Sequence, residues 1–284
     1  MNTSFKLNMG CLKGPILVFG GPYSNLAATQ AIKQKVEQLG LLSSQVICTG
    51  DVVAYCAEPE ATVELLRRWG IHVVLGNCEE SLGSEAPDCG CGFEMGTACS
   101  ALSIDWYRFA AQRVSSDSKA WMRNLPRSIG FELNGRTFLV IHGGVEQINR
   151  FIFASTPVED KWGELDLAAT DGVIAGHCGL PFGQHINDKV WLNAGVIGMP
   201  ANDGTRDGWY MLLKSESNLI RITWHRLSYD VERSHRSMQE AGLSKGYTDA
   251  LLSGLWPSQD VLPGIERSQQ GQPINPQPLF FMSK

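Results

Sequence analysis

The chain has 284 residues and a formal net charge of −5 at pH 7, with 43% hydrophobic and 19% charged residues. This length and composition fit one large α/β domain with a short appendage. The negative charge and the lack of a basic run disfavour a nucleic-acid-binding stripe, and no apolar stretch approaches the roughly 20 residues that span a bilayer. We therefore expect a cytoplasmic protein whose eight cysteines are thiols or metal ligands rather than disulfides.

Short apolar runs alternate with amphipathic segments in the first part of the chain. They predict strands at residues 15–19, 45–49 and 71–75 and helices at residues 26–39 and 58–69. This alternation indicates a parallel sheet with right-handed crossovers. Ligands bind at the carboxyl ends of the strands in such sheets, so the loops after these strands are the first place to look for a site.

The second half of the chain turns mainly to strands. Helices are expected at residues 98–114, 118–125, 231–241 and 247–255, and strands at residues 130–133, 136–141, 172–175, 190–193, 209–213 and 219–226. Asn134-Gly135 predicts a hairpin between two of these strands, and the Cys- and Gly-rich residues 80–96 predict a loop. Two mixed sheets flanked by helices, an α/β sandwich of four αββα layers, fit this order.

Four segments are expected along the chain. They are an N-terminal extension (residues 1–14), the main domain (15–228), a C-terminal helical extension (229–266) and a mobile tail (267–284). The tail is rich in Gln and Pro, which gives it little apolar surface to bury.

Five loops that follow predicted strands carry glycine-rich or polar motifs. In chain order they are Phe19-Gly-Gly-Pro-Tyr-Ser-Asn-Leu26, Gly50-Asp51, Gly76-Asn77-Cys78-Glu79, Ile141-His142-Gly143 and Gly176-His177-Cys178-Gly179. Each motif is weak alone, but the ordered set resembles the calcineurin-like metallophosphoesterase superfamily, and within it the small bacterial branch of predicted phosphoesterases. The resemblance covers roughly residues 15–226 and implies a metal-dependent phosphoesterase, a phosphoric ester hydrolase acting on phosphomonoesters or phosphodiesters.

The resemblance also implies ligands for two neighbouring metal ions. The second site is complete in this chain: Asp51, Asn77, His142 and His177. The first site lacks its private ligands, because Gly21 and Tyr23 stand where the family has Asp and His, and Gly179 replaces the last His. Every departure falls on one site, so we expect an atypical centre that binds one divalent ion (Mn, Fe or Zn) more readily than two.

Cysteines near these loops are candidates to rebuild the first metal site or to serve a redox role. They are Cys178, which directly follows a ligand histidine, and Cys89 and Cys91 in the loop after the third motif. Thiolate ligands would favour Zn or Fe, and a thiolate-rich iron site is one alternative. The other is that these cysteines are small buried apolar residues, since Cys-x-Cys is tighter than the usual Cys-x-x-Cys zinc knuckle.

Cys78 stands where the family often has its general-acid histidine, so the resemblance makes Cys78 and Asp51 the candidate catalytic residues. A thiol is a weaker acid at neutral pH than a protonated histidine. We therefore expect slow hydrolysis that favours good leaving groups, unless Glu79 or water supplies the proton.

Three residues are candidates to bind a small phosphorylated substrate: Asn25, Tyr23 and Arg150. Asn25 is also the expected cap of the first helix, and Arg150 either clamps a phosphate or is an ordinary exposed arginine. Tyr23 has three interpretations: a phenolate ligand, a substrate contact, or a packing residue in the space of the missing metal. A rival function stays open, namely an inactive scaffold or a metal or redox sensor. The sequence does not indicate the oligomeric state.

Overall fold

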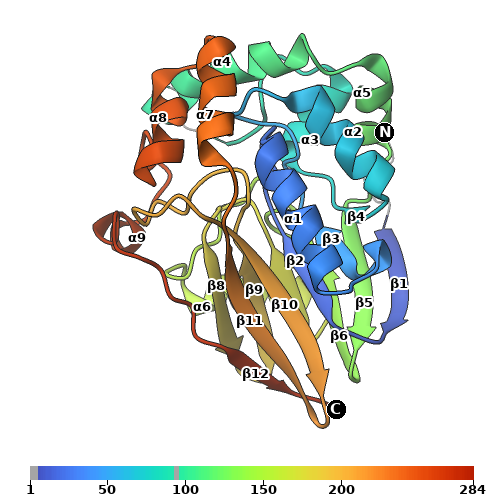
Figure 1. The fold of residues 1–284 in the computed structure, drawn as a ribbon. Coiled ribbons are helices and arrows are strands. Elements are labelled where there is room, and N and C mark those ends of the chain that lie inside the picture. The colour runs from blue at the N-terminus through green and yellow to red at the C-terminus, as the bar shows by residue number, and fades with distance from the viewer. Residues whose placement is uncertain (1–5, 93–95) are drawn as a thin grey trace.

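Two six-stranded mixed sheets form the centre of the computed structural model, which describes residues 6–92 and 96–284 (Figure 1). One sheet runs β1 (Lys6–Leu12), β5 (Ser128–Leu133), β6 (Arg136–Val140), β7 (Gly172–Ala175), β9 (Lys189–Ala194) and β8 (Pro181–Ile186). The other runs β12 (Leu279–Met282), β11 (Leu219–Leu227), β10 (Gly208–Glu216), β2 (Ile16–Phe19), β3 (Val46–Cys48) and β4 (His72–Val73).

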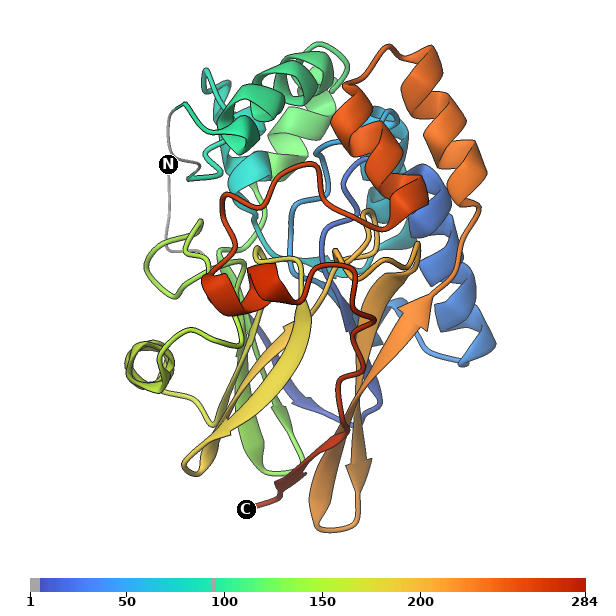
Figure 2. The same ribbon diagram turned by 90° about the vertical axis from the view of Figure 1, so that its left-hand side faces the viewer.

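The two sheets pack face to face over an apolar core. Val18 and Met211 of one sheet and Val140 and Ile174 of the other are completely buried in it. On the outer faces, α1 (Leu26–Gln38) and α2 (Pro59–Trp69) cover the β2 sheet, and α6 (Val158–Ala168) covers the β7 sheet, where Figure 2 shows it end-on at the left. This arrangement confirms the predicted αββα sandwich.

The remaining helices gather mainly above the upper ends of the sheets in Figure 1. They are η1 (Ser43–Gln45), α3 (Asn77–Ser84), α4 (Ala98–Ala111), α5 (Ser116–Arg123), α7 (Val231–Glu240), α8 (Lys245–Ser253) and α9 (Gly264–Ser268). None of the helices described here is long and apolar enough to cross a membrane.

Local signals in the first half place most elements correctly. β2, β3 and β4 are parallel neighbours, as expected. Asn25 caps α1 by accepting a hydrogen bond from the backbone N of Ala28, and Gly70 ends α2 in the left-handed conformation that glycine favours. β5 and β6 form the predicted antiparallel hairpin.

Several expectations were wrong where pairing partners lie far apart in sequence. The loop expected at residues 80–96 begins with the second half of α3, and residues 93–95 of it lie outside the described part. The expected N-terminal extension contributes β1, which pairs with β5, and its residues 1–5 are not described. The tail expected to be mobile from residue 267 ends in β12, which pairs with β11. We did not predict α6, β8 or α9.

Asp171 at the start of β7 ties the chain terminus to the sheet. Its carboxylate accepts hydrogen bonds from the backbone N of Thr137 at 2.9 Å and lies 2.7 Å from Nζ of Lys284 and 3.3 Å from Nη1 of Arg136. Burial alone would raise the pKa of Asp171, but Lys284 and Thr137 outweigh it and hold the pKa at about 2.

We expect Asp171→Asn to lower the free energy of unfolding by about 1–2 kcal/mol at pH 7. A depressed carboxylate pKa stabilises the fold above the unfolded-state value of 3.8, and this contribution disappears as the pH falls toward 2. Urea denaturation of metal-free protein at pH 7 and pH 2.5 measures it. An equal deficit at both values would show that the charge of Asp171 is not the cause.

Candidate metal centre

The four expected ligands meet at the carboxyl ends of four strands. Asp51 follows β3, Asn77 opens α3 after β4, His142 follows β6 and His177 follows β7. The sheets bring together residues that are up to 126 positions apart in sequence, the separation of Asp51 and His177. One ligand atom from each of Asp51, His142 and His177 lies within 4.8 Å of the others.

The backbone of these loops is shaped to present the ligands. Asp51 and His177 adopt left-handed φ angles of 56° and 60°, which non-glycine residues rarely adopt. Gly76 lets the neighbouring loop come close, because a Cβ atom there would lie 2.5 Å from Oδ1 of Asp51. Strained residues of this kind persist where the surrounding structure holds them, and they concentrate at functional sites.

Four potential ligand atoms converge at the centre of this cluster. Nδ1 of His142 lies 2.7 Å from the carbonyl of Thr49, which can only accept, so Nδ1 carries a proton and Nε2 is the nitrogen that can bind a metal. Asn77 donates through Nδ2 to the carbonyl of Cys89 at 2.9 Å, which turns its Oδ1 toward His142. A carboxylate oxygen of Asp51 and Nδ1 of His177 complete the group.

The spacing of these atoms fits one divalent ion. Nε2 of His142 lies 3.0 Å from Oδ1 of Asn77, 3.1 Å from Nδ1 of His177 and 3.4 Å from Oδ1 of Asp51. Ligand atoms held about 2.1 Å from a shared ion lie about 3.0–3.4 Å from one another. Two imidazoles, a carboxylate and an amide oxygen can therefore hold a borderline divalent metal such as Mn, Fe or Zn.

The pKa shifts also indicate that this cluster favours a positive charge at its centre. Burial lowers the pKa of His142, but Asp51 outweighs it and the net shift is upward. Burial together with the neighbouring His142 lowers the pKa of His177 to about 3, so this ring is neutral and able to bind a metal. Burial alone would raise the pKa of Asp51, but the neighbouring His142 outweighs burial and the net shift is downward. The carboxylate therefore stays ionised.

Glu79 organises the loops around the ligands, a role that the sequence did not reveal. Its fully buried carboxylate accepts hydrogen bonds from the backbone N atoms of Asp51 (2.8 Å), Val53 (3.1 Å) and Gly76 (3.3 Å). These bonds join the loop after β3 to the start of α3. Glu79 does not line the cavity beside the ligands, so these bonds make it a positioning residue.

We expect Glu79→Ala to lower the free energy of unfolding by at least about 3 kcal/mol, since it leaves three buried N–H groups without partners. Its metal affinity should fall too, because Asp51 loses its support. Thermal denaturation and metal titration measure the two effects. Glu80→Ala is the matched control, as that neighbouring side chain is 42% exposed. Similar losses in both variants would contradict this role of Glu79.

Aromatic rings cover the positions where the first metal site lacks ligands. A Cβ atom at Gly21 would lie 2.5 Å from Cζ of Tyr23, and one at Gly179 would lie 3.2 Å from Cζ2 of Trp256. The Tyr23 side chain thus packs over Gly21 and is 5% exposed, which supports its interpretation as a packing residue. Both rings line a cavity that also borders Asp51 and His177.

Two of the expected substrate contacts have other partners. Asn25 is 1% exposed; Ala28 and Ser234 donate to its Oδ1, and its Nδ2 donates to Gly198 and Tyr229. Arg150 pairs with Glu164 at 2.5 Å and Asp160 at 3.5 Å, both on α6. Neither residue lines the cavity, so Asn25 joins α1 to α7 and Arg150 holds α6.

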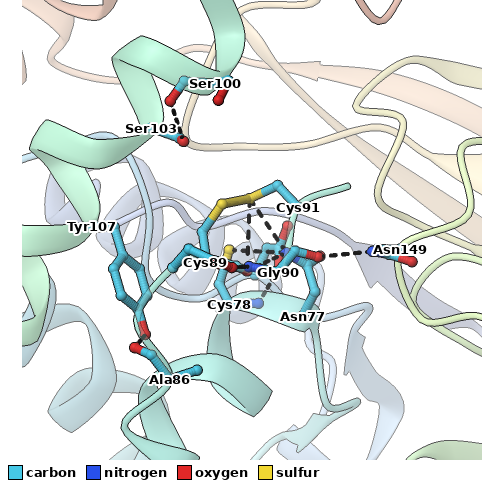
Figure 3. Close-up of a disulfide and its surroundings, with 12 residues drawn as sticks. Asn77, Cys78, Ala86, Cys89, Gly90, Cys91, Ser100, Ser103, Tyr107 and Asn149 are labelled. Atoms are coloured by element: carbon cyan, nitrogen blue, oxygen red, sulfur yellow. Dashed lines mark hydrogen bonds between the residues drawn. A yellow bond between two sulfur atoms is a disulfide. The ribbon is translucent and has the colours of Figure 1, made fainter. Parts of the chain in front are cut away.

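The cysteines do not complete a second metal site. Cys89 and Cys91 form a disulfide, which corrects the expectation that all cysteines are thiols (Figure 3). Sγ of Cys91 accepts from Nδ2 of Asn77 at 3.4 Å, so the disulfide supports the orientation of this ligand. Sγ of Cys178 accepts from Asn193 at 3.2 Å. Among the described residues, no cysteine belongs to the ligand cluster of Asp51, His142 and His177.

Cys78 lies beside Asp51 rather than in the cavity. It is 1% exposed, and its thiol hydrogen-bonds the Asp51 carboxylate. Burial, followed by the charge of Asp51, raises the pKa of this thiol well above its usual value. The side chain therefore keeps its proton at neutral pH but does not line the space open to a substrate.

Known proteins share this sequence pattern and fold. A sequence model of the calcineurin-like phosphoesterase superfamily domain matches residues 24–218. An uncharacterised protein of Methanocaldococcus jannaschii is 24% identical over 261 residues, covering 86% of this chain and 99% of the relative.

Two solved structures share the fold. A hypothetical protein of Pyrococcus horikoshii superposes with a TM-score of 0.73 at 13% identity, over 85% of this chain and 99% of that one. A metallophosphoesterase of Sphaerobacter thermophilus superposes with a TM-score of 0.66 at 19% identity, over 86% of this chain and 100% of that one. With the family match over residues 24–218, these findings show that the chain belongs to the calcineurin-like phosphoesterase superfamily.

Proposed function

We propose that this protein hydrolyses phosphoesters with one divalent ion held by Asp51, Asn77, His142 and His177. The convergence of four buried ligand atoms on one point carries this proposal, because two imidazoles, a carboxylate and an amide oxygen at these distances favour a cation among them. The superfamily match adds that phosphoester hydrolysis is the chemistry this fold supports. A divalent ion held by these four residues would supply positive charge to a phosphoryl oxygen and would lower the pKa of bound water.

The surrounding residues orient the site and keep it dry. Thr49 fixes the tautomer and ring plane of His142, and Cys89 fixes the amide of Asn77. Phe151 packs against the ring of His177 at a centroid distance of 4.1 Å, which limits the access of water to that side. These contacts hold the ligands in place before a substrate arrives.

Protonation of the leaving group is the weak step in this site. Cys78 directs its thiol to Asp51, and Glu79 accepts three backbone hydrogen bonds. His177 is the one remaining histidine at the cavity, and its ring is a ligand. Without a positioned general acid, the leaving group must depart largely unprotonated, so the rate depends on the acidity of the alcohol or phenol that is released.

We expect kcat/KM for p-nitrophenyl phosphoesters to exceed that for alkyl phosphoesters of the same charge by at least about 100-fold, the range that general acid catalysis spans. With the metal-loaded protein, the release of p-nitrophenol measures the first rate and the release of the alkyl alcohol measures the second. Comparable rates for both esters would show that an acid is present after all.

The rival function is a metal-binding scaffold or sensor without turnover. The rings of Tyr23 and Trp256 over Gly21 and Gly179 favour it, because they replace ligands that a two-metal enzyme uses. Metal content and turnover measured on the same sample separate the functions. Bound metal with turnover that His142→Ala abolishes supports the enzyme, bound metal without turnover supports the sensor, and no bound metal supports a scaffold.

A further inference from the structure

The cavity beside the metal ligands has an aromatic wall that metal binding does not require. Tyr23, Tyr55, Phe151, Tyr247 and Trp256 line it together with Met199. Tyr55 stacks on Tyr247 at a centroid distance of 4.5 Å and meets Tyr23 edge-on at 4.7 Å. These contacts join the three tyrosine rings into one surface, and Asp51 and His177 line the same cavity.

The C-terminal segment builds much of this wall. Tyr247 lies on α8, and Trp256 follows it in the strand-free stretch that crosses the upper end of the sheets toward α9 in Figure 2. Trp256 is fixed at both ends, since its backbone N donates to Asn202 at 2.8 Å and its indole N donates to Pro200 at 2.7 Å. A ring held in this way loses little freedom when a ligand stacks on it.

The charge of the lining is as informative as its shape. Among the residues that the structure describes in this lining, Asp51 and His177 are the only carboxylate and imidazole, and none is a lysine or an arginine. Arg150, the nearest candidate by sequence, pairs with Glu164 and Asp160 on α6. A phosphomonoester carries about −1.5 to −2 charges at pH 7, and this lining offers no side-chain cation to balance the second one.

The size of the cavity limits what can fill it. Its volume of about 70 Å³ gives room for roughly five water molecules. That space suits a single six-membered ring beside a phosphoryl group.

We propose that this cavity binds the organic group of a singly charged phosphoester, a phosphodiester or phosphonate monoester that carries one aromatic ring. The inference deepens the proposed phosphoesterase function and rests on it. Tyr23 and Trp256 occupy the space that the first metal site would need. The aromatic rings that stand in place of the second cation therefore provide an apolar binding surface, which we call the aromatic seat. Burying one phenyl ring against such a wall favours binding.

Binding of three phosphonates that the protein does not need to cleave tests this proposal. Methyl phenylphosphonate has one charge and a ring, methyl methylphosphonate has one charge and no ring, and phenylphosphonate has a ring and up to two charges. We expect methyl phenylphosphonate to bind the metal-loaded full chain at least about ten times more tightly than methyl methylphosphonate and about three times more tightly than phenylphosphonate, by calorimetry at pH 8.

Trp256→Ala should remove most of the preference for the ring, and Trp162→Ala, on the surface of α6 and 37% exposed, should retain it. Equal binding of the two methyl esters by the wild-type protein would overturn the aromatic seat without any variant. Tighter binding of phenylphosphonate would overturn the singly charged class. If the wild-type protein shows this binding pattern but no turnover, the result would count against the proposed hydrolysis and not against the aromatic binding surface. The two failures are therefore distinct.

Discussion

His142→Ala is expected to weaken metal binding by at least about 100-fold, which is more than the loss typical of residues that only support a ligand. His142 is the centre of the cluster, because its Nε2 lies within 3.4 Å of ligand atoms from Asn77, His177 and Asp51. Without the His142 side chain, the ion loses one imidazole ligand and only three of the four ligands remain. Titration of metal-free protein with Mn²⁺ or Zn²⁺ measures the change.

Two further variants make this result interpretable. Asp51→Asn keeps the volume of the side chain but removes its charge, so it should weaken metal binding even where the fold is unchanged. His185→Ala removes an exposed histidine on β8 and should bind metal as the wild type does. Wild-type affinity in His142→Ala, with the circular dichroism spectrum unchanged, would contradict the assigned ligand set.

Gly21→Ala is expected to lower the free energy of unfolding by at least about 3 kcal/mol. The new methyl group would lie 2.5 Å from the ring of Tyr23 and 2.7 Å from Cγ1 of Val196, and φ at this position is +42°. Gly40→Ala is the matched control, because Gly40 also has a positive φ, +66°, but nothing lies within 4 Å of its Cβ position. It should cost only about 1 kcal/mol.

A double-mutant cycle then identifies the obstacle. In a Tyr23→Ala background, Gly21→Ala should cost at least about 1 kcal/mol less than it does alone, because the ring that it meets is gone. Urea denaturation of the four proteins measures this coupling. Equal costs in both backgrounds would show that Tyr23 does not occupy the space of the absent ligand.

The resemblance to the superfamily indicated which residues form the ligand cluster, and the convergence of their loops follows from rules that act along the chain. Each motif stands where an apolar strand stops, and parallel strands bring their carboxyl ends to one edge. Asp51, Asn77, His142 and His177 therefore meet although they come from four separate loops.

The link from Asn25 to α7 and the role of Arg150 were not predictable in the same way, although the capping of α1 by Asn25 was predicted. Asn25 is held by Ser234, 209 positions later in the chain, and Arg150 by Glu164 on a helix that we did not predict. A side chain in a motif loop can bind substrate or a neighbouring element, and only the distant partner decides which. Trp256 carried no motif at all, although it covers Gly179.

The edge strands β1 and β12 were missed for a related reason. β12 has four residues, and its buried pattern of Leu279 and Phe281 is too short to stand out from a polar tail. Its pairing with β11 supplies the order that its sequence lacks. Short strands of this kind depend on tertiary context more than on local propensity.

Anomalous diffraction from crystals grown with Mn²⁺ or Zn²⁺ tests the central claim most directly, because it counts the ions and locates them. We predict one anomalous peak per chain, within bonding distance of Asp51, Asn77, His142 and His177. A second strong peak between Asp51 and the Gly21 and Gly179 loops, or no peak at the four ligands, would contradict the one-metal centre.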